Sequence, residues 1–64
     1  MKKYDLVGVD GNAFAVMAYV LRAMRECRFS KAAMDEYKKD ATSSNYVHLI
    51  NASLEMIEKC NETL

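Results

Sequence analysis

The sequence predicts a mainly α-helical single domain over residues 1–64, in which a short N-terminal strand or arm precedes three helices. Apolar residues recur at helical spacing in three stretches, a capping residue precedes each stretch, and the chain contains no proline. A chain of this length buries only about 60% of the surface that its unfolded form exposes. Such small domains usually need a disulfide, a metal or self-association for stability. The sequence favours self-association, as a homo-oligomeric dimer or tetramer.

The N-terminal segment contains a short run of residues that favour β structure. This run extends from Tyr4 to Val9, and Asp10, Gly11 and Asn12 then favour a turn. We therefore predict a short strand over residues 4–9. Because a lone strand cannot satisfy its own backbone, it would pair with the same strand of another subunit or lie as an extended arm.

The first predicted helix runs from Ala13 to about Arg28, with Asn12 as its N-cap. A helix turns about 100° per residue, which places apolar residues on two opposite sides. One side holds Phe14, Met17, Leu21 and Met24, and the other holds Val16, Val20, Ala23 and Cys27. We expect the side of Val20 to face a neighbouring subunit, because the chain has few elements of its own to cover both sides.

Two further helices are predicted after this one. Ser30 caps a helix from Lys31 to about Asp40. The polar junction of residues 42–45 then precedes a third helix from about Asn45 to Cys60. The inward positions of the second helix are Met34, Tyr37 and Ala41, and those of the third are Tyr46, Leu49, Ile50, Ser53, Leu54, Ile57 and Cys60.

Residue types that support catalysis or metal binding are scarce. His48 is the one histidine, and Cys27 and Cys60 have no zinc-ligand spacing or nucleophile–base pattern. Asp5 and Asp10 could form an acid–base or metal-binding pair, but they are better explained as an exposed strand residue and a turn residue, respectively. We therefore predict no enzyme, no metal and no cofactor, and interpret both thiols as reduced, buried apolar groups.

The charge balance argues against binding to duplex nucleic acid. Nine basic residues match nine acidic residues, so no net field attracts polyanions. A helix-turn-helix formed by the last two helices would place Glu55 and Glu58 on its recognition helix, which opposes DNA binding. No apolar run is long enough for a membrane-spanning helix or a signal peptide, so we expect a cytoplasmic protein without a membrane partner.

Two predicted helix starts are candidate sites for a small anionic ligand. Unpaired backbone N–H groups and a positive dipole end would attract phosphate at Gly11-Asn12-Ala13 and at Thr42-Ser43-Ser44. Arg22 and Arg25 would hydrogen-bond phosphate or a guanine edge, and Tyr46, Tyr19 or Phe14 would stack on a base.

Each of these residues also has an ordinary structural explanation. Asn12 and one of the hydroxyl residues would simply cap helices, and Arg22 would pair with Glu26 four residues later. Arg25 shares a side with Phe14 and Leu21, which suggests that it ends a groove. His48 lies off the apolar face of the third helix and fits an exposed polar residue better than a ligand contact.

Three segments resemble a family of very small proteins encoded by bacteriophages and mobile elements. They are Val9-Asp10-Gly11-Asn12-Ala13-Phe14, Val20-Leu21-Arg22-Ala23-Met24-Arg25, and Ala41-Thr42-Ser43-Ser44-Asn45-Tyr46-Val47-His48-Leu49. The most specific parts are Gly-Asn-Ala-Phe and Ala-Thr-Ser-x-x-Tyr-x-His-Leu. The chain departs from the family at Ser44, where glycine is expected, and at Val47, where an acidic residue is usual.

The resemblance implies a sponge protein, an oligomer that sequesters a nucleotide immune signal of the anti-phage CBASS pathway without hydrolysing it. The implied ligand is a cyclic dinucleotide such as cyclic GMP-AMP, and the implied contacts are Gly11, Asn12, Ala13, Phe14, Arg22, Arg25, Thr42, Ser43, Tyr46 and His48. The alternative is a small helical module whose exposed apolar face on the first helix binds a host or phage protein and alters its activity. A nucleotide site would need Arg22 or Arg25 close to a helix start, whereas a protein-binding groove would need only the apolar side.

Overall fold

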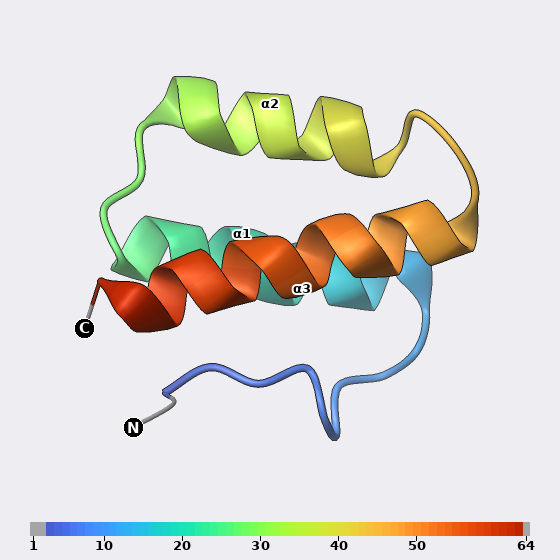
Figure 1. Ribbon diagram of the computed structural model, residues 1–64, viewed down its shortest axis with the longest axis horizontal. Helices are drawn as coiled ribbons and strands as arrows, with labels where there is room; N and C mark the ends of the chain where they lie inside the picture. The colour runs from blue at the N-terminus through green and yellow to red at the C-terminus, as the bar shows by residue number, and fades with distance from the viewer. Residues whose placement is uncertain (1–2, 64) are drawn as a thin grey trace.

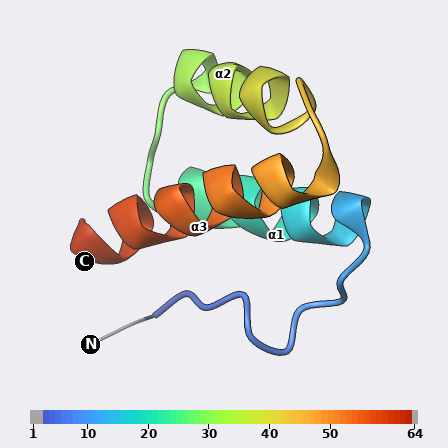
Figure 2. The same ribbon diagram turned by 45° about the vertical axis from the view of Figure 1, so that its right-hand side comes forward.

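The computed structural model describes residues 3–63, which form three α-helices in this range. Helix α1 spans Ala13–Glu26, α2 spans Lys31–Ala41 and α3 spans Tyr46–Glu62. Helices α1 and α3 lie side by side and run in the same direction, while α2 runs the opposite way across them (Figure 1). The N-terminal segment passes along the side of α1 and α3 that faces away from α2 (Figure 2). The predicted mainly helical fold is confirmed.

Each helix begins at a side-chain cap. Asn12 Oδ1 accepts the N–H of Phe14 at 2.8 Å, Ser30 Oγ accepts that of Ala33 at 3.1 Å, and Asn45 Oδ1 accepts that of His48 at 2.9 Å. These bonds satisfy backbone donors that the first turn of a helix leaves unpaired. Asn12 and Ser30 are the predicted caps. The third cap is Asn45, so Thr42, Ser43 and Ser44 precede the helix and do not begin it.

Helix α1 ends in a Schellman motif formed around Arg28. The N–H of Phe29 donates to the carbonyl of Met24 at 2.9 Å, and that of Arg28 donates to Arg25 at 3.0 Å. Arg28 has a φ of 64°, a left-handed conformation that glycine usually adopts at this position. The helix therefore ends at Glu26, and the predicted extension to Arg28 is wrong by two residues because the chain turns away there.

The core lies between the three helices and is supplied mainly by α1 and α3. Val20, Met24, Ser53 and Cys60 are its most deeply buried side chains. Helix α2 contributes Tyr37 and Ala41, as predicted, and Tyr37 donates a hydrogen bond of 2.7 Å to Ser53. Ser53 donates in turn to the carbonyl of Leu49 at 2.7 Å, so the buried hydroxyl groups are paired with each other and with the backbone.

The predicted strand at residues 4–9 is wrong. This segment consists of bends and turns, with a hydrogen bond from Val9 N–H to the Leu6 carbonyl at 3.0 Å and a φ of 89° at Gly8. It is an arm attached to the same chain. Asn61 accepts from the N–H of Tyr4 at 3.0 Å and donates to the Tyr4 carbonyl at 3.0 Å. The side-chain amide of Asn61 on α3 thus pairs the backbone N–H and carbonyl of Tyr4, which in a sheet would be paired with a neighbouring strand.

The two predicted sides of the first helix differ strongly in burial. Val16, Val20 and Ala23 pack inside the chain, and Val20 has no exposed surface, so the expectation that it faces a neighbouring subunit is wrong. On the other side Met24 is also fully buried, whereas Phe14 is 82% exposed. Helix α3 and the arm cover a wider arc of α1 than the sequence suggested. On the side of Phe14, burial therefore varies along the helix, and Phe14 itself remains uncovered at the start of α1.

Candidate functional site

The starts of α1 and α3 lie at the same end of the helical bundle (Figure 1). The hydroxyl group of Tyr46, the first residue of α3, donates a hydrogen bond to the carbonyl of Gly11, which precedes α1. A Cβ atom at Gly11 would lie 3.6 Å from that hydroxyl oxygen, which is an ordinary contact distance. We call residues 10–14 and 42–48 the helix-start end. It joins the two segments that carry the most specific motifs of the sequence.

Backbone donors at the helix-start end are partly occupied. Asp10 Oδ1 accepts the N–H of Asn12 at 3.0 Å, and the amide caps Asn12 and Asn45 each accept one N–H of the following helix. A helix has four N–H groups without intrahelical partners at its start, so one cap leaves others available for solvent or a ligand. The predicted cap Asn12 is confirmed, whereas the prediction that a Thr or Ser hydroxyl caps the third helix is wrong because Asn45 does so; capping by these two amides leaves room for a phosphate site.

The hydroxyl groups of Thr42 and Ser43 face the end of α2. Thr42 Oγ1 donates to the carbonyl of Lys38 at 2.8 Å, and Ser43 Oγ donates to that of Asp40 at 2.6 Å. They pair the unsatisfied carbonyls of the last turn of α2. Both residues lie at the helix-start end as expected, but their hydroxyl groups donate to carbonyls of α2 and are not directed toward a ligand.

Aromatic and imidazole side chains are accessible at the same end. The side chain of Tyr46 is 48% exposed, and Phe14 is more exposed still. His48 Nε2 lies 3.2 Å from Asp40 Oδ1, which makes a hydrogen bond, or an ion pair when the imidazole is protonated. Tyr46 is therefore half-exposed, and the hydrogen bond from its hydroxyl to Gly11 orients its ring.

Arg22 and Arg25 do not reach the helix-start end of their own chain. They lie nine and twelve residues beyond Ala13, about 14 and 18 Å along the helix axis. Arg22 Nε pairs with Glu26 Oε2 at 3.4 Å, as the structural interpretation of the sequence predicted, and Arg25 is exposed on the side of Phe14. The structure thus separates the predicted ligand contacts into a helix-start group and an arginine group.

A polar cluster that the sequence did not predict joins the arm to α1. Tyr4 is 7% exposed and its hydroxyl donates to Glu26 Oε1 at 2.9 Å, while the hydroxyl oxygen of Tyr19 accepts the N–H of Asp5 at 2.9 Å. Burial and the bond to Glu26 raise the pKa of Tyr4, while the Tyr4 hydroxyl lowers the pKa of Glu26. The isolated tyrosine in a β-prone run was the only signal for this contact.

The two thiols lie beside each other although 33 residues separate them. Cys27 Sγ is 3.6 Å from the carbonyl oxygen of Cys60, and both cysteines are free. Burial, with a smaller effect of the neighbouring Cys27 thiol, raises the pKa of Cys60 to about 12. Helical periodicity placed each thiol on an inward side but gave no information that the two would meet.

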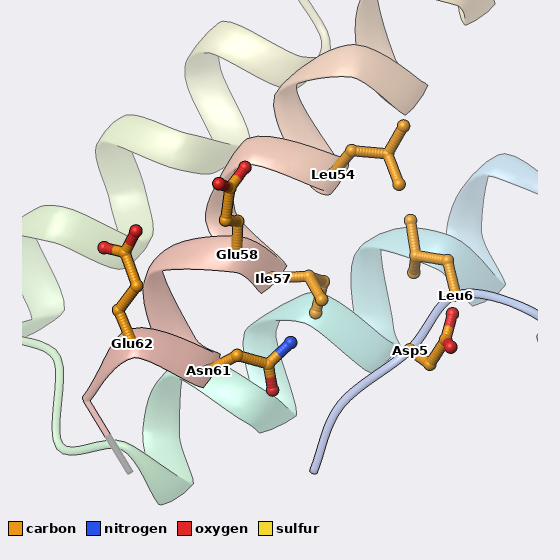
Figure 3. Close-up of a pocket in the computed structure, with 7 residues that line it drawn as sticks. All are labelled: Asp5, Leu6, Leu54, Ile57, Glu58, Asn61 and Glu62. Atoms are coloured by element: carbon orange, nitrogen blue, oxygen red, sulfur yellow. The ribbon is translucent and has the colours of Figure 1, made fainter. Parts of the chain in front are cut away.

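A groove of about 500 Å³ runs between the arm and α3. Leu6 faces Leu54 across it, and Ile57 and Asn61 point toward the arm, whereas the carboxylates of Glu58 and Glu62 extend from the other side of α3 (Figure 3). With Asp5 on the arm, the groove has an apolar floor and acidic borders. The groove therefore combines an exposed apolar side chain, Leu54, with carboxylates along its borders.

Within residues 3–63, no group of three or more histidine, cysteine, aspartate or glutamate side chains is arranged to hold a metal ion. The described helices are all too short or too polar to cross a membrane. No protein-family model, curated protein or solved structure matches this chain.

Proposed function

We propose that this protein binds a small anionic nucleotide, of the cyclic dinucleotide class, at the helix-start end and sequesters it without hydrolysing it. One observation carries the proposal. The segments Gly11–Phe14 and Thr42–His48 are far apart in sequence and meet through the hydrogen bond between Tyr46 and Gly11. They are also the segments in which the sequence most closely resembles phage sponge proteins.

The chemistry of this end suits a phosphate joined to a base. Two helix N-termini provide backbone N–H groups and positive dipole ends, which favour an anion. The exposed ring of Tyr46 lies beside them, and an aromatic ring stacks on a base with an energy of about 1–3 kcal/mol. Lys38 and Lys39 in the last turn of α2 supply positive charge near the start of α3.

Sequestration depends on affinity and copy number, because a binder without turnover removes its ligand by mass action. The proposal implies action in the cytoplasm of the host cell, where a diffusible nucleotide signal would be encountered. It does not require Arg22 or Arg25 of the same chain, since both lie well along α1. These arginines would contact the ligand only if a second copy brought them to the helix-start end.

Isothermal titration calorimetry with cyclic GMP-AMP, other cyclic dinucleotides and AMP tests this function. We expect Tyr46→Ala to weaken binding about tenfold to a hundredfold through loss of stacking. Lys31→Ala is the control, because it removes an exposed side chain at the start of α2, outside the helix-start end. Ligand recovered intact after denaturation would support sequestration. The absence of binding heat for every nucleotide would reject the proposal.

A second candidate function is a protein-interaction module, and the groove between the arm and α3 favours it. Its exposed Leu54 and the neighbouring Leu6 form an apolar surface against which apolar side chains of a partner protein could pack. Affinity capture with wild-type protein and with Leu54→Asp would distinguish the two functions. A partner lost with Leu54→Asp and retained with Tyr46→Ala would favour the interaction module over nucleotide binding.

A further inference from the structure

The outward side of α1 carries a stripe of residues at coiled-coil spacing. Phe14, Ala18, Leu21 and Arg25 follow one another at intervals of four, three and four residues, which keeps them on one side of a helix. Phe14 is 82% exposed, Ala18 and Arg25 are exposed, and Leu21 is half-buried. We call these four residues the α1 stripe. The two ends of this stripe differ, because an exposed phenylalanine lies at its N-terminal end and an exposed arginine lies at its C-terminal end.

The outward side of α3 carries a stripe with the same spacing. It consists of Val47, Asn51, Leu54 and Glu58, all of them exposed, and we call it the α3 stripe. Val47 is 65% exposed and Leu54 is 50% exposed. The exposed large apolar residues of residues 3–63 are five, and three of them belong to these two stripes. Each stripe therefore begins with a large apolar residue, repeats one seven positions later and ends in a charge.

The terminal charges of the two stripes are opposite. Arg25 ends the α1 stripe and Glu58 ends the α3 stripe, and neither belongs to an ion pair within residues 3–63. The chain has no net charge, so copies do not repel one another at long range. Leu54 and Glu58 both line the groove, so the α3 stripe runs along its border.

We propose that the α1 stripe of one copy packs in parallel against the α3 stripe of a second copy. In this register Phe14 lies against Val47, Leu21 lies against Leu54, and Arg25 lies against Glu58. Side chains repeating at intervals of three and four residues allow two helices to pack at a small crossing angle. The contact is head-to-tail, so each copy uses its α1 stripe toward one neighbour and its α3 stripe toward another.

Charge distinguishes this arrangement from a symmetric one. Two α1 stripes packed in parallel would bring two copies of Arg25 together, and two α3 stripes would do the same with Glu58, which is unfavourable. Antiparallel pairing of identical stripes would place Phe14 or Val47 against a charged residue. Only the mixed, parallel pairing matches apolar residues with apolar residues and opposite charges with each other.

The same register would bring the start of α1 in one copy beside the start of α3 in the next, because Phe14 meets Val47. The helix-start ends of two copies would then lie next to each other. The proposed pairing depends on the spacing, exposure and charge of the two stripes and not on nucleotide binding. The molecular mass of the assembly in solution is sufficient to test it.

The test is a charge exchange followed by light scattering coupled to size exclusion, from ten to several hundred micromolar protein. Wild-type protein is expected to exceed the monomer mass of 7.3 kDa. Arg25→Glu and Glu58→Arg should each lower the mass to that of the monomer, because each places like charges in every contact. The double variant, and an equal mixture of the two single variants, should recover the assembly.

Glu36→Arg and Lys39→Glu on α2 are matched controls, because they reverse exposed charges outside both stripes. They should leave the mass unchanged, and circular dichroism should show the same helicity for every variant. A monomeric wild-type protein, or single variants that keep the wild-type mass, would overturn the proposal. Single variants that become monomers but do not recover on mixing would also overturn it, because they would exclude the head-to-tail pairing.

Discussion

Tyr46 donates the hydrogen bond of its side-chain hydroxyl to the carbonyl of Gly11, 35 residues earlier in the chain. This contact joins the start of α3 to the turn before α1 and orients a half-exposed ring at the helix-start end. A bond between exposed groups contributes about 0.5–1.5 kcal/mol at most, so its main consequence is the position of the ring.

Tyr46→Phe should separate the ring from its hydroxyl. We expect a loss of unfolding free energy of about 1 kcal/mol, since only one hydrogen bond is removed. If the ring stacks on a base, nucleotide affinity should change far less with Tyr46→Phe than with Tyr46→Ala. Chemical denaturation and calorimetry on the same preparations measure both quantities. Equal losses of affinity in the two variants would contradict a stacking role.

Val20→Asp and Phe14→Asp should behave in opposite ways. Val20 is fully buried inside its own chain, so an unpaired carboxylate there should cost about 3–5 kcal/mol and unfold the protein. Phe14 is 82% exposed, so the same substitution should leave the helical content unchanged. Far-ultraviolet circular dichroism during heating measures this difference. A folded Val20→Asp variant would show that Val20 is not a core residue of the single chain.

The ion-paired Glu26 predicts a pH dependence of stability. Its pKa is lowered in the folded protein, mainly by the hydrogen bond from Tyr4, so Glu26 stabilises the fold above its unfolded pKa of about 4.5. That contribution should disappear as the pH falls through the lower, folded pKa. The stability difference between wild type and Glu26→Gln should therefore shrink between pH 6 and pH 2. Glu36→Gln on α2 is the control, and an equal shrinkage there would contradict the assignment.

The two cysteines should differ in reactivity. The pKa of Cys60 is raised to about 12 and its side chain is buried, so little reactive thiolate forms at neutral pH. Cys27 is half-buried and should react first. Iodoacetamide at pH 8 should add one label to the native protein and two after denaturation, as seen by intact mass spectrometry. Peptide mapping that finds the first label on Cys60 would contradict this order.

Arg28→Gly should stabilise the end of α1. Arg28 adopts a φ of 64°, which costs an L-residue about 1–2 kcal/mol, while glycine adopts it freely. Glycine also gains freedom in the unfolded chain, so we expect a net gain of up to about 1 kcal/mol. Arg28→Val should destabilise, because a β-branched residue fits this conformation poorly. Urea denaturation measures both changes, and a loss of stability with glycine would contradict the argument.

The three helices and most of their starting points could be predicted from local features of the sequence, namely capping residues and apolar residues at helical spacing. Asn12 and Ser30 lie directly before apolar residues at helical spacing, and each satisfies a backbone donor of the following turn. The inward positions predicted for α2 were also correct, because the charged residues of this helix lie on its opposite side. Asn45 shows the limit of this reasoning, since four polar residues in a row offered several possible caps.

Tertiary packing alone decided which apolar residues of α1 are covered. Val20 and Phe14 are both apolar residues of one helix, and burial of one and exposure of the other depends on where α3 and the arm lie. The meeting of Tyr46 with Gly11, of Cys27 with Cys60, and of Tyr4 with Asn61 has the same origin. Helical periodicity specifies a direction around one axis, whereas these contacts require the relative position of several axes. That position is set by simultaneous filling of a shared core, which no local segment specifies.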